Sequence, residues 1–466
     1  MSYPFEEIIA FCKRRGLVFS TSSIYGGLAN CYDYGPLGVE LLKNLKNLWW
    51  TEFIYQPEQM YSLDSQIILH PQTWISSGHV DSFTDPLVED KITHERFRAD
   101  HLIEHYCQKK KLPVDTTKMS INEMTQFIDK NQIKSPHGNL LTQPKNFNIL
   151  FESSIGVIAG EKNTVYLRGE TAQGIFTNFK NIINTYRVKL PFGVGGIGKS
   201  FRNEITTGQF VFRTLEFEQA EIEYFFNPQK SEWLKLFKEW QNRIWHFLTQ
   251  TLKLQEANLR WREHSDKERS HYSLATSDLE YQYSFGFKEV WGLAYRTNYD
   301  LKKHQKFCHE DLSFHDSQSD EKFLPHVIEP ALGINRLFLA ILSDCLWFDG
   351  DKKRLVLKLP VHLAPIKIAV FPLLKNKPDL INKAKQIYQQ LKSKYHQVTF
   401  DDRGNIGKRY LYQDEIGTPF CLTIDFETLE KNTLTVRERD SANQQRISID
   451  KLISYFDDKI LTNNNI

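Results

Sequence analysis

The sequence predicts a main α+β domain, built on an antiparallel sheet flanked by helices, followed by a smaller α/β domain. Between residues 148 and 360, aromatic and β-branched segments typical of strands dominate, and two helical segments near 231–254 and 333–344 interrupt them. From residue 366 onward, strand-like and helix-like segments alternate. A chain of 466 residues is also too long for one compact core, which agrees with two or three domains.

The N-terminal region predicts two amphipathic helices. The first covers residues 5–15 and the second covers residues 37–55. The apolar positions of the second helix recur at the spacing of one helix face: Leu41, Leu42, Leu45, Leu48 and Trp49. Packing against a core is the plain interpretation of both helices.

Residues 100–145 differ in composition from the segments around them. They are polar and rich in Lys and Gln, with a loop at Ser135-Pro136-His137-Gly138. This change of character predicts an insertion into the main domain rather than a continuation of its sheet.

A β-hairpin is predicted near residues 200–225. Its first strand ends with Phe201-Arg202-Asn203-Glu204, and its second strand covers residues 212–221. Thr206-Thr207-Gly208-Gln209 supplies the turn between them. The flanking runs are rich in Phe, Val, Ile and Tyr, which favour strands.

The polar side chains of this hairpin gather on few faces, because side chains alternate across a strand. Arg202 and Glu204 should share one face of the first strand. One face of the second strand collects four side chains: Arg213, Phe217, Gln219 and Glu221. Arginines suit phosphate oxygens, an aromatic ring offers a stacking surface, and carboxylates can hold a metal ion or an ammonium group. The hairpin alone leaves open the alternative of a solvated surface with cross-strand ion pairs.

A short apolar strand runs into a helix near residues 326–342. The junction reads His326-Val327-Ile328-Glu329-Pro330-Ala331-Leu332-Gly333-Ile334-Asn335-Arg336. Apolar residues then recur at helical spacing: Leu337, Phe338, Ile341 and Leu342. Arg336 in the first helical turn opposes the helix dipole, which favours a ligand or a carboxylate partner for its guanidinium.

The C-terminal part predicts a small α/β domain with a mixed sheet. Strands are expected at residues 366–371, 398–401, 419–425 and 433–438. Helices are expected at residues 378–395, 406–414 and 449–456. Lys408 and Arg409 give one of these helices a basic face, a feature that is more often solvated than bound to a nucleic acid.

Composition narrows the function only loosely. With 59 basic and 57 acidic residues the net charge is +2, so RNA binding would depend on local patches of charge. Six cysteines without CxxC spacing favour free thiols in a reducing compartment over disulfides or a zinc site. No signal-peptide core and no apolar run of membrane-spanning length occurs, so we expect a cytoplasmic protein that does not associate with membranes.

Taken together, the two charged segments resemble signature motifs of class II aminoacyl-tRNA synthetases. FRNE, a loop and FRTLEF, from Phe201 to Phe217, resemble the second motif, and residues 326–342 resemble the third. Further strings, in the same order along nearly the whole chain, resemble the dimeric glycyl-tRNA synthetases: Ile24-Tyr25-Gly26-Gly27-Leu28-Ala29, Tyr32-Asp33-Tyr34-Gly35-Pro36-Leu37-Gly38, Arg98-Ala99-Asp100-His101, Phe147-Asn148-Ile149-Leu150-Phe151, Leu167-Arg168-Gly169-Glu170-Thr171-Ala172-Gln173-Gly174 and Lys288-Glu289-Val290-Trp291-Gly292-Leu293-Ala294. Each string is weak alone, but the ordered set is specific to this family.

The resemblance implies a class II synthetase fold with three parts. Residues 1–99 and 146–360 would form the catalytic domain, and residues 100–145 would be an insertion in it. Residues 361–466 would form an anticodon-binding domain. The three motifs would lie near residues 24–55, 200–225 and 326–342. The helix at residues 37–55 would also build a homodimer interface.

The resemblance also implies the reaction of a glycine–tRNA ligase. Glycine and ATP give glycyl-adenylate and pyrophosphate, and glycine is then transferred to the 3′ end of tRNA(Gly). The implied catalytic residues act by positioning and charge neutralisation rather than as nucleophiles: Arg202, Glu204, Arg213 and Arg336. The implied ATP site is larger: Arg202, Asn203, Glu204, Phe212, Arg213, Thr214, Leu215, Glu216, Phe217, Glu289, Val290, Gly333, Ile334, Asn335 and Arg336.

Individual roles follow from the same resemblance. Arg202 would grip the α-phosphate, and Arg213 would hold the pyrophosphate end of a bent ATP. Phe217 and Arg336 would cover the two faces of the adenine. Glu289 would be a ligand of Mg²⁺, which prefers few carboxylates together with phosphate oxygens and water.

The implied glycine pocket holds the ammonium group with carboxylates and rejects larger amino acids by a clash with their Cβ. Glu170, Glu221 and Glu329 would face the ammonium, and Arg98 would contact the substrate. The whole implied set is Arg98, Glu170, Phe217, Glu218, Gln219, Ala220, Glu221, Glu329, Pro330, Ala331, Leu332 and Gly333.

Two positions depart from the family's pattern. Ala331 stands where family members commonly have a serine, which leaves open how selectivity is enforced at that contact. Many members also carry cysteines near residues 135–138, where this chain has none, so no zinc is expected.

Two other functions stay open from the sequence. A class II synthetase for threonine, proline or histidine would share the three motifs, but not the YGG, RADH and GETAQG strings together. A non-catalytic, synthetase-like subunit that binds nucleic acid should have lost the arginines for ATP, and this chain keeps Arg202, Arg213 and Arg336.

Overall fold

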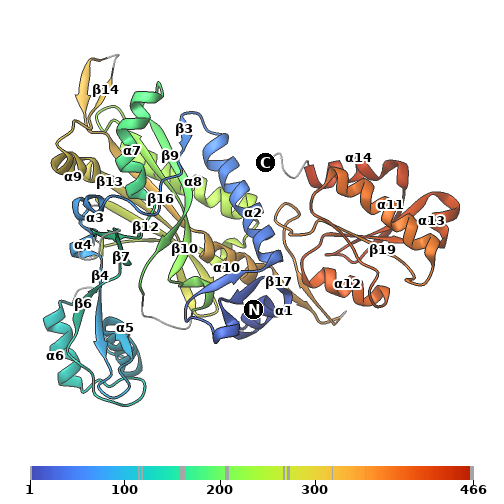
Figure 1. Cartoon of the computed structure of the whole chain (residues 1–466), viewed down its shortest axis with the longest axis horizontal. Helices are drawn as coiled ribbons and strands as arrows, with labels where there is room; N and C mark the ends of the chain where they lie inside the picture. Colours follow the sequence, from blue (N-terminus) through green and yellow to red (C-terminus); the bar gives the residue numbers. More distant parts are fainter. Residues whose placement is uncertain are drawn as a thin grey trace.

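The computed structural model describes residues 3–113, 116, 119–156, 163–204, 209–265, 268–269, 273–316, 319–351 and 353–461. A large central body carries a smaller unit at each of two ends (Figure 1). One unit contains helices α5 (Ala99–Lys110) and α6 (Ile121–Asn131), and the other is the C-terminal α/β domain. In the described ranges, no helix combines the length and apolar character needed to cross a membrane.

The central body is built on a seven-stranded sheet. Every neighbouring pair is antiparallel except the edge pair β3 and β9, which is parallel. This confirms the antiparallel sheet that the sequence predicts. Across the sheet the strands run in the order β11 (Leu259–Glu263), β12 (Ala275–Tyr283), β13 (Gly286–Thr297), β16 (His326–Gly333), β10 (Glu216–Phe226), β9 (Phe192–Phe201) and β3 (Met60–Ser62).

Helices cover both faces of this sheet, and the two faces differ in chemistry. The first face packs on four helices: α1 (Phe5–Arg15), α2 (Pro36–Trp50), α8 (Trp233–His246) and α10 (Ile334–Cys345). Strand alternation sends Ala220 and Ile222 of β10 into that core. The intervening residues Gln219, Glu221 and Glu223 therefore lie on the opposite face, which is the polar one.

The opposite face is partly covered by α7 (Ala172–Thr185) and α9 (Tyr299–Cys308), which lie beside each other in Figure 1. Neither helix was predicted, since only two helices were expected between residues 148 and 360. Aromatic and β-branched residues in Ile175-Phe176-Thr177 and around Tyr299 favour a strand locally. In the folded protein, however, Phe176, Phe179 and Leu301 are buried in a second core, and this burial stabilises the helices over the local preference for a strand.

Two predicted helices are shorter than expected but continue in π-helical turns. α2 ends at Trp50 and is followed by a π turn at Thr51–Tyr55. α8 ends at His246 and is followed by a π turn at Phe247–Thr251. The first predicted helix matches α1 over Phe5–Arg15.

The predicted hairpin is present as β9 and β10, but its strands are shorter than expected. β9 ends at Phe201 and β10 begins at Glu216, so Arg202, Glu204 and Arg213 lie in the connection and not on the strands. After Phe201 the chain leaves the ladder, because the Asn203 amide donates to the Ile149 carbonyl. The prediction that these three residues lie on the faces of the two strands is therefore wrong. Of the predicted turn, residues 206–208 lie outside the described residues.

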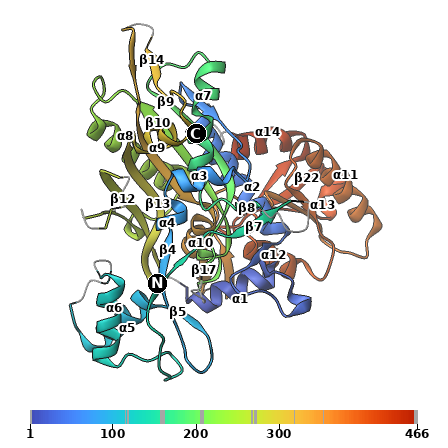
Figure 2. The ribbon, with the colours of Figure 1, turned by 60° about the vertical axis from the view of Figure 1, so that its left-hand side comes forward.

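The unit that contains α5 and α6 has its own sheet and core. Its sheet has the order β5 (Arg96–Arg98), β4 (Thr84–Glu89) and β6 (Lys145–Asn148). The core joins the sheet to both helices: Val88, Ala99, Ile103, Cys107, Met124, Ile128, Ile133 and Leu141. The polar composition hid these helices, because only one narrow face of each is apolar. Figure 2 shows the unit projecting from the central body.

A buried carboxylate ties two loops of this unit together. Asp90 is fully buried, accepts a hydrogen bond from the Ser135 hydroxyl, and accepts two from the Asn139 amide. It also accepts the backbone amides of Ile92 and Thr93. The loop at residues 135–139 is thus held by hydrogen bonds to the turn after β4.

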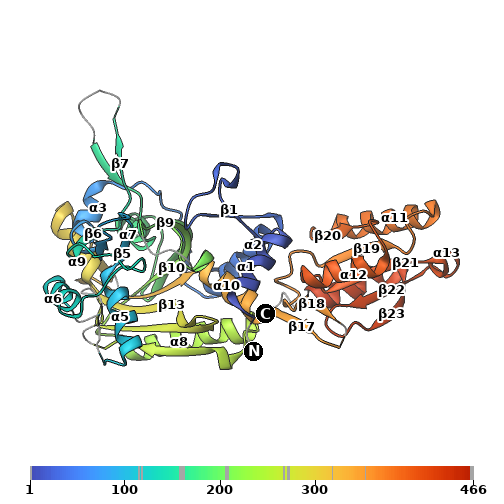
Figure 3. The same ribbon diagram turned by 90° about the horizontal axis from the view of Figure 1, so that it is seen from below.

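Short elements complete the central body. Figure 3 shows the hairpin that begins with β7 projecting from its surface. The remaining helices are α3 (Pro71–Ser76) and α4 (His79–Ser82). The remaining strand pairs are β1 (Val18–Ser20) with β2 (Tyr32–Tyr34), β7 (Glu152–Ile155) with β8 (Asn163–Tyr166), β14 (Phe314–Asp316) with β15 (Glu321–Phe323), and β17 (Leu346–Asp349) with β18 (Arg354–Leu357).

The C-terminal domain has the mixed sheet that the sequence predicts, with five strands instead of the four expected. Its order is β20 (Val398–Phe400), β19 (Ile368–Pro372), β21 (Phe420–Ile424), β22 (Thr433–Glu438) and β23 (Gln444–Ser448). β20, β19 and β21 are parallel, and β22 and β23 are antiparallel. Its helices are α11 (Pro378–Lys394), α12 (Ile406–Glu415), α13 (Phe426–Lys431) and α14 (Leu452–Phe456). Only α13 and β23 were not predicted.

Arg409 is buried, so the prediction that it shares an exposed basic face with Lys408 is wrong. Its guanidinium donates to the Pro372 carbonyl at 2.5 Å, and to the carbonyls of Asp401 and Leu373. The side chain therefore satisfies carbonyl groups at the carboxyl ends of β19 and β20. Lys408 alone is exposed.

Buried ion pairs fasten the C-terminal domain to the hairpin β17–β18. Asp414 on α12 is fully buried between Arg354 of β18 and Arg437 of β22. The Arg354 Nη1–Asp414 Oδ2 distance is 2.7 Å, and Arg437 donates two hydrogen bonds to the same carboxylate at 2.7 and 2.9 Å. Gln397 adds hydrogen bonds to Glu40 and Asn44 of α2.

Replacing Asp414 with alanine should strongly destabilise the protein, because two buried guanidinium groups lose their shared carboxylate. We expect a loss of about 3–5 kcal/mol in the free energy of unfolding. The measurement is chemical denaturation of the full chain, with Glu430→Ala, at an exposed position, as the matched control. A loss equal to that of the control would contradict the proposed role of this carboxylate.

Candidate active site

A pocket opens on the polar face of the central sheet, where β10 and β16 meet the residues that follow β9. Its lining combines arginines, carboxylates and aromatic rings: Arg202, Glu204, Phe212, Arg213, Thr214, Phe217, Glu218, Gln219, Glu289, Ala331, Gly333, Asn335 and Arg336. All of them belong to the ATP or glycine residues predicted from the sequence. Segments more than a hundred residues apart in the chain thus meet in one cavity.

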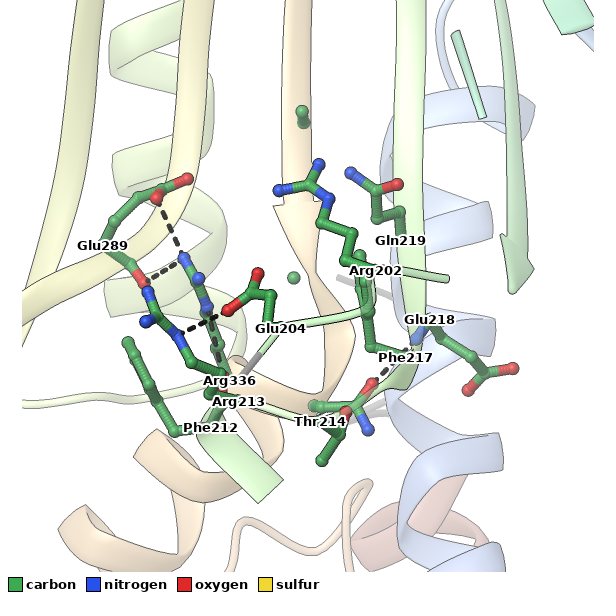
Figure 4. A pocket seen from close by; sticks show the side chains of 13 residues that line it. Arg202, Glu204, Phe212, Arg213, Thr214, Phe217, Glu218, Gln219, Glu289 and Arg336 are labelled. Carbon is green, nitrogen blue, oxygen red and sulfur yellow. Dashed lines mark hydrogen bonds and ion pairs between the residues drawn. The ribbon is translucent and has the colours of Figure 1, made fainter. Parts of the chain in front are cut away.

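The charged side chains form two groups within the pocket (Figure 4). On one side, Arg336 Nη1 lies 2.9 Å from Glu289 Oε2, and Arg213 Nε lies 2.9 Å from Glu204 Oε2. On the other side, Arg202 lies with Phe217 and Gln219. Arg336 and Arg213 each already have a carboxylate partner. A phosphate group that binds them would therefore have to compete with these ion pairs.

Two arginines of the pocket contact aromatic rings. The Arg202 guanidinium carbon lies 5.3 Å from the centroid of Phe217, and its Nε donates to the Gly169 carbonyl at 3.1 Å. The Arg336 guanidinium carbon lies 4.6 Å from the centroid of Phe212. Gly333 makes room for Arg336, since a Cβ at this position would lie 3.2 Å from the Arg336 Cδ.

Burial and pairing shift the pKa values of the ionisable groups in the pocket. Burial alone would raise the pKa of Glu289, but the Arg336 guanidinium more than offsets it and the pKa is lowered. Burial lowers the pKa of Arg213, against the opposing effect of Glu204. The pocket therefore favours the ionised form of Glu289 beside the Arg336 guanidinium.

Five of the predicted ATP residues lie outside the lining of this pocket. Val290 and Ile334 are buried in the core on the other face of the sheet. Asn203 and Leu215 make backbone hydrogen bonds to Ile149 and Asn30. Glu216 is exposed and pairs with Lys199.

The predicted ammonium-binding carboxylates lie together, deeper than the pocket. Glu170, Glu221 and Glu329 are all more than nine-tenths buried. Glu221 continues the strand face of Phe217 and Gln219, and it accepts hydrogen bonds from the amide and hydroxyl groups of Thr171. An arginine-lined pocket and a carboxylate cluster are thus adjacent on one strand face.

Arg296 neutralises much of this cluster. It is 1% exposed, its Nη1 donates to Glu329 Oε2 at 2.6 Å, and its Nε and Nη2 donate to Asp300 at 2.8 Å. Gln173 joins Asp300 to Glu170 by donating to both at 3.0 Å. Glu329, Asp300 and Glu170 are therefore joined in one hydrogen-bonded assembly.

Glu170 has a second partner in His79. The two side chains lie 3.3 Å apart, between His79 Nε2 and Glu170 Oε2. Burial would raise the pKa of Glu170, but His79, Arg296 and Gln173 together lower it below its ordinary value. Glu170 is thus held as an anion.

Comparison with known proteins agrees with this geometry. The family model described as an anticodon binding domain matches residues 367–459. Proteins named glycine–tRNA ligase align over nearly the full chain. The relative from Lachnoclostridium phytofermentans is 48% identical, over 98% of this chain and 99% of its own. The relative from Mesoplasma florum is 47% identical, over 97% and 99%, and that from Clostridium tetani is 47% identical, over 98% of each. The chain belongs to the glycine–tRNA ligase family.

Membership of the glycine–tRNA ligase family confirms the resemblance seen in the sequence and the expected class II architecture. The predicted glycine-binding residues are divided between the pocket and the core of the sheet. Ala331 lies between Glu221 of β10 and Gly292 of β13 in the strand register, and it lines the pocket. Ala220, Pro330 and Leu332 are buried, and Ala220 and Leu332 point into the core on the other face.

Two charged residues of the predicted glycine set have partners elsewhere. The carboxylate of Glu218 pairs with Lys46 of α2 at 3.0 Å. Arg98, at the end of β5, pairs with Asp85 at 2.8 Å and Asp100 at 2.6 Å. The Arg98 charge also contributes to lowering the pKa of Arg213, which lines the pocket. Arg98 therefore lies near the pocket, on the unit that contains α5 and α6.

Several residues in and around the carboxylate cluster were not predicted from the sequence: His79, Gln173, Glu223, Arg296, Asp300 and His304. Glu223 could have been found, because it alternates with Glu221 on the same strand face. Arg296 and Asp300 have the i, i+4 spacing of an ion pair, which is a weak signal. The pairing of His79 with Glu170 could not be predicted from local sequence, because the two residues are 91 positions apart in the chain.

Replacing Arg296 with methionine should leave Glu329 and Asp300 buried without their guanidinium partner. We expect a loss of about 3–5 kcal/mol in the free energy of unfolding. Urea denaturation measures it, and Arg403→Met, at a side chain that is 81% exposed, is the control. An effect no larger than that of Arg403→Met would mean that the cluster does not depend on Arg296.

Proposed function

We propose that this protein is a glycine–tRNA ligase, which forms glycyl-adenylate from glycine and ATP and then transfers glycine to the 3′ end of tRNA. Relatives at 47–48% identity over nearly the whole chain carry that name. One feature of the site carries the assignment: the strand face that presents Phe217 and Gln219 in the arginine-lined pocket continues directly into Glu221 of the carboxylate cluster. A nucleotide site and an ammonium site therefore adjoin.

In the first step, the glycine carboxylate attacks the α-phosphate of ATP and pyrophosphate leaves. The protein needs no nucleophile for this, but it must align the reactants and neutralise charge on the phosphate oxygens. We assign Arg202 to the α-phosphate, because it lies between the carboxylate cluster and the rest of the pocket. Arg213 is assigned to the pyrophosphate end, and Phe217 and Arg336 to the two faces of the adenine.

ATP binding would then rearrange two ion pairs. Arg336 must leave Glu289, and Arg213 must loosen from Glu204, before either can serve the nucleotide. Phosphate oxygens can replace these carboxylates, because they accept the same paired hydrogen bonds. Glu289, released from Arg336, is free to serve as a magnesium ligand.

The residues present fit Mg²⁺ as a partner of ATP. Magnesium is bound by one or two carboxylates together with phosphate oxygens, so it needs no cage of protein ligands. Glu289 would supply that carboxylate, and when bound the ion would offset charge on the phosphates. Retention of full exchange activity after complete removal of divalent ions would contradict this assignment.

For glycine, we assign the ammonium group to Glu170, Glu221 and Glu329. Ala331 lies beside Glu221 in the sheet and Gly292 lies on the other side of Ala331, and we assign these two residues to the wall that a larger amino acid would meet. Ala331 provides no hydroxyl group, so selectivity at this wall depends on shape and on the carboxylates.

These observations argue against the two alternative functions, a synthetase for another amino acid and a non-catalytic subunit. A synthetase for another amino acid would need space for a side chain, whereas the region beyond Gln219 is filled by buried side chains, among them Glu221, Glu223 and Glu329. A non-catalytic subunit would not need three arginines in one pocket, and Arg202, Arg213 and Arg336 all line it.

ATP–pyrophosphate exchange tests this function without requiring tRNA. We expect exchange with glycine and little with alanine or serine, because the pocket holds the ammonium group and leaves no room for a Cβ. Arg202→Ala should lower the glycine-dependent rate by about 10²–10³-fold, as the loss of one contact to developing charge does. Equal exchange with alanine would contradict the glycine assignment, and near-normal exchange by Arg202→Ala would contradict the role of that arginine.

For tRNA, we propose that the loops at the carboxyl ends of β19, β20 and β21 form the binding edge of the C-terminal domain. Parallel strands bring these ends to one side of a sheet, where ligands of such folds commonly bind. The amide of Leu373 donates to the Ile424 carbonyl and holds two of the loops together. Arg409 is excluded from direct contact because it is buried beneath this edge.

Exposed side chains at this edge suit unpaired RNA bases. Phe426 is 49% exposed and Leu374 is 39% exposed, although both are apolar. Arg403 is exposed, and Asp401 holds its guanidinium with hydrogen bonds of 2.9 and 3.2 Å. Aromatic rings and guanidinium planes are surfaces on which unstacked bases bind.

Phe426→Ala should weaken tRNA binding by about 1–3 kcal/mol, the usual value of one base stacked on an aromatic ring. The expected result is a rise of roughly tenfold in the KM for tRNA in aminoacylation. Phe307→Ala, at an exposed phenylalanine on α9, is the matched control, and exchange without tRNA reports on the catalytic domain. An unchanged KM for tRNA in both Phe426→Ala and Arg403→Ala would contradict this edge.

We also propose that the protein is a cytoplasmic homodimer. The segment between β1 and β2 exposes three apolar side chains: Ile24 at 85%, Tyr25 at 86% and Leu28 at 61%. Exposed apolar groups of this size gathered within residues 24–28 favour an interface with another chain. A monomer in light scattering at micromolar concentration would contradict the proposed dimer.

The domain boundary is proposed to lie near residue 366 rather than at 360. Leu359 and Leu363 are buried in the core of the central body, together with Leu357. The apolar core of the C-terminal domain starts at Ile368. We keep residues 100–145 as an insertion, and propose that β4, β5 and β6 belong to the same unit.

A further inference from the structure

Glu223 is a buried carboxyl group that the proposed mechanism does not use. It lies on β10 two residues beyond Glu221, on the same face of the strand, and it is 0% exposed. Neither of its carboxylate oxygens has a hydrogen-bond partner in the part of the chain that the structure describes. An ionised carboxylate in such a place is very costly, because burial removes its hydration without replacement.

The strand register sets Glu223 directly across from Glu329. β10 and β16 are antiparallel, with Glu221 paired to Ala331 and Tyr224 paired to Ile328. The two intervening positions therefore place Ile222 across from Pro330 and Glu223 across from Glu329. Side chains opposite each other have Cβ atoms only about 4.5–5.5 Å apart, and like charges there repel.

The surroundings contain too little positive charge for all the carboxylates. Five buried carboxyl groups, those of Glu170, Glu221, Glu223, Glu329 and Asp300, lie around one guanidinium that donates to them, that of Arg296, and two buried histidines, His79 and His304. The Arg168 guanidinium also lies near Glu221 but donates to carbonyl groups and to Ser65, and burial lowers the pKa of His304. Arg296 donates to Glu329 and Asp300, and His79 pairs with Glu170. Thr171 donates to Glu221. Among the described residues, none donates a hydrogen bond to Glu223, in contrast to the other four carboxyl groups.

We propose that Glu223 and Glu329 share one proton in the free protein, carried on Glu223, and that this proton leaves to solvent when the glycine ammonium enters. The step balances charge, since one positive charge enters the cluster and one proton departs. The inference rests on the proposed function, because it requires glycine to bind beside Glu221 and Glu329. Glu223 is a positioning residue in this scheme, acting through the charge of Glu329.

The electrostatic surroundings agree with this geometry. Burial raises the pKa of Glu223 well above its ordinary value, and the nearby Glu329, Glu221 and Asp300 raise it further while Arg296 opposes them. Burial also raises the pKa of Glu329, against the opposing effect of Arg296, and Glu221, Glu170 and Asp300 raise it further, so the two carboxyl groups do not readily ionise together. The hydrogen bond from Arg296 to Glu329 decides which member of the pair stays ionised, so the proton belongs on Glu223.

The shared proton has a consequence for selectivity. Without it, the empty cluster would hold several uncompensated negative charges and would attract any small cation. A neutral Glu223 keeps the free site close to balanced, and full negative charge develops only when an ammonium group is present. The cluster thus selects its ligand by charge as well as by shape.

The sign of the pH dependence follows directly. Below the pKa of the shared proton, glycine must expel a proton to bind, so its affinity falls as the pH falls. Above that pKa no proton is displaced, and affinity becomes independent of pH. The KM for glycine should therefore drop by up to about tenfold per pH unit as the pH rises from about 6 to about 8.

The experiment measures the KM for glycine in ATP–pyrophosphate exchange across this pH range. The wild-type protein should show the slope, and Glu223→Gln, which has a neutral side chain of the same shape, should show a flat profile. Glu256→Gln, at an exposed glutamate outside the cluster, should keep the wild-type slope. A slope retained in Glu223→Gln, or a flat profile in the wild type, overturns the inference.

Calorimetry of the wild-type protein keeps the test decisive if Glu223→Gln does not fold. Glycine binding measured in two buffers of different ionisation enthalpy should show release of about one proton at pH values below the pKa. No proton release overturns the inference. Failure of the proposed function looks different, because the wild type would then show no glycine-dependent exchange at any pH.

Discussion

The ion pairs of Arg296 are the interaction on which the candidate site depends. One guanidinium joins Glu329 of β16 to Asp300 of α9, and Gln173 of α7 extends the assembly to Glu170. Strand β16 and two helices on the polar face of the sheet are thereby tied together around a set of carboxylates. Without this guanidinium, Glu329 and Asp300 would lose their compensating charge, and their burial beside the other carboxylates would become costly.

The sheet then arranges two kinds of chemistry along a single strand. On β10, one face runs from Phe217 and Gln219 in the arginine-lined pocket to Glu221 and Glu223 in the cluster. The other face of the same strand packs Ala220 and Ile222 into the main core, which keeps the strand rigid. Nucleotide and amino acid are thus brought together by a part of the fold that cannot shift without disturbing its core. The ion pairs at the rim, by contrast, can exchange partners when phosphate arrives.

Much of this arrangement follows from local sequence patterns. The alternation of Phe217, Gln219 and Glu221 predicts a common face, and the apolar spacing around Leu337 predicts α10 with Arg336 at its start. Two kinds of feature could not be predicted this way. Strand ends were missed because long-range hydrogen bonds, such as that from Asn203 to Ile149, decide where a ladder stops. Helices α7 and α9 were missed because tertiary burial overrides local preference.

Partners that lie far apart in the chain explain the remaining errors. Arg409 was expected on a surface because Lys408 and Arg409 are adjacent, yet carbonyl groups of Pro372 and Leu373 draw it inside. Arg296 and His79 meet Glu329 and Glu170 only in the folded chain. Buried charge compensation is a property of the whole fold, so a local pattern indicates which carboxylates are present but not what neutralises them.

The central claim is that the carboxylate cluster recognises the ammonium group of glycine. Glycolate tests it most directly, because it keeps the carboxylate and the size of glycine but replaces the ammonium with a hydroxyl group. The account predicts that ATP–pyrophosphate exchange with glycolate falls by roughly 10⁴-fold relative to glycine, as expected for a site with buried groups left unpaired. Exchange with glycolate at a rate close to that with glycine would contradict it.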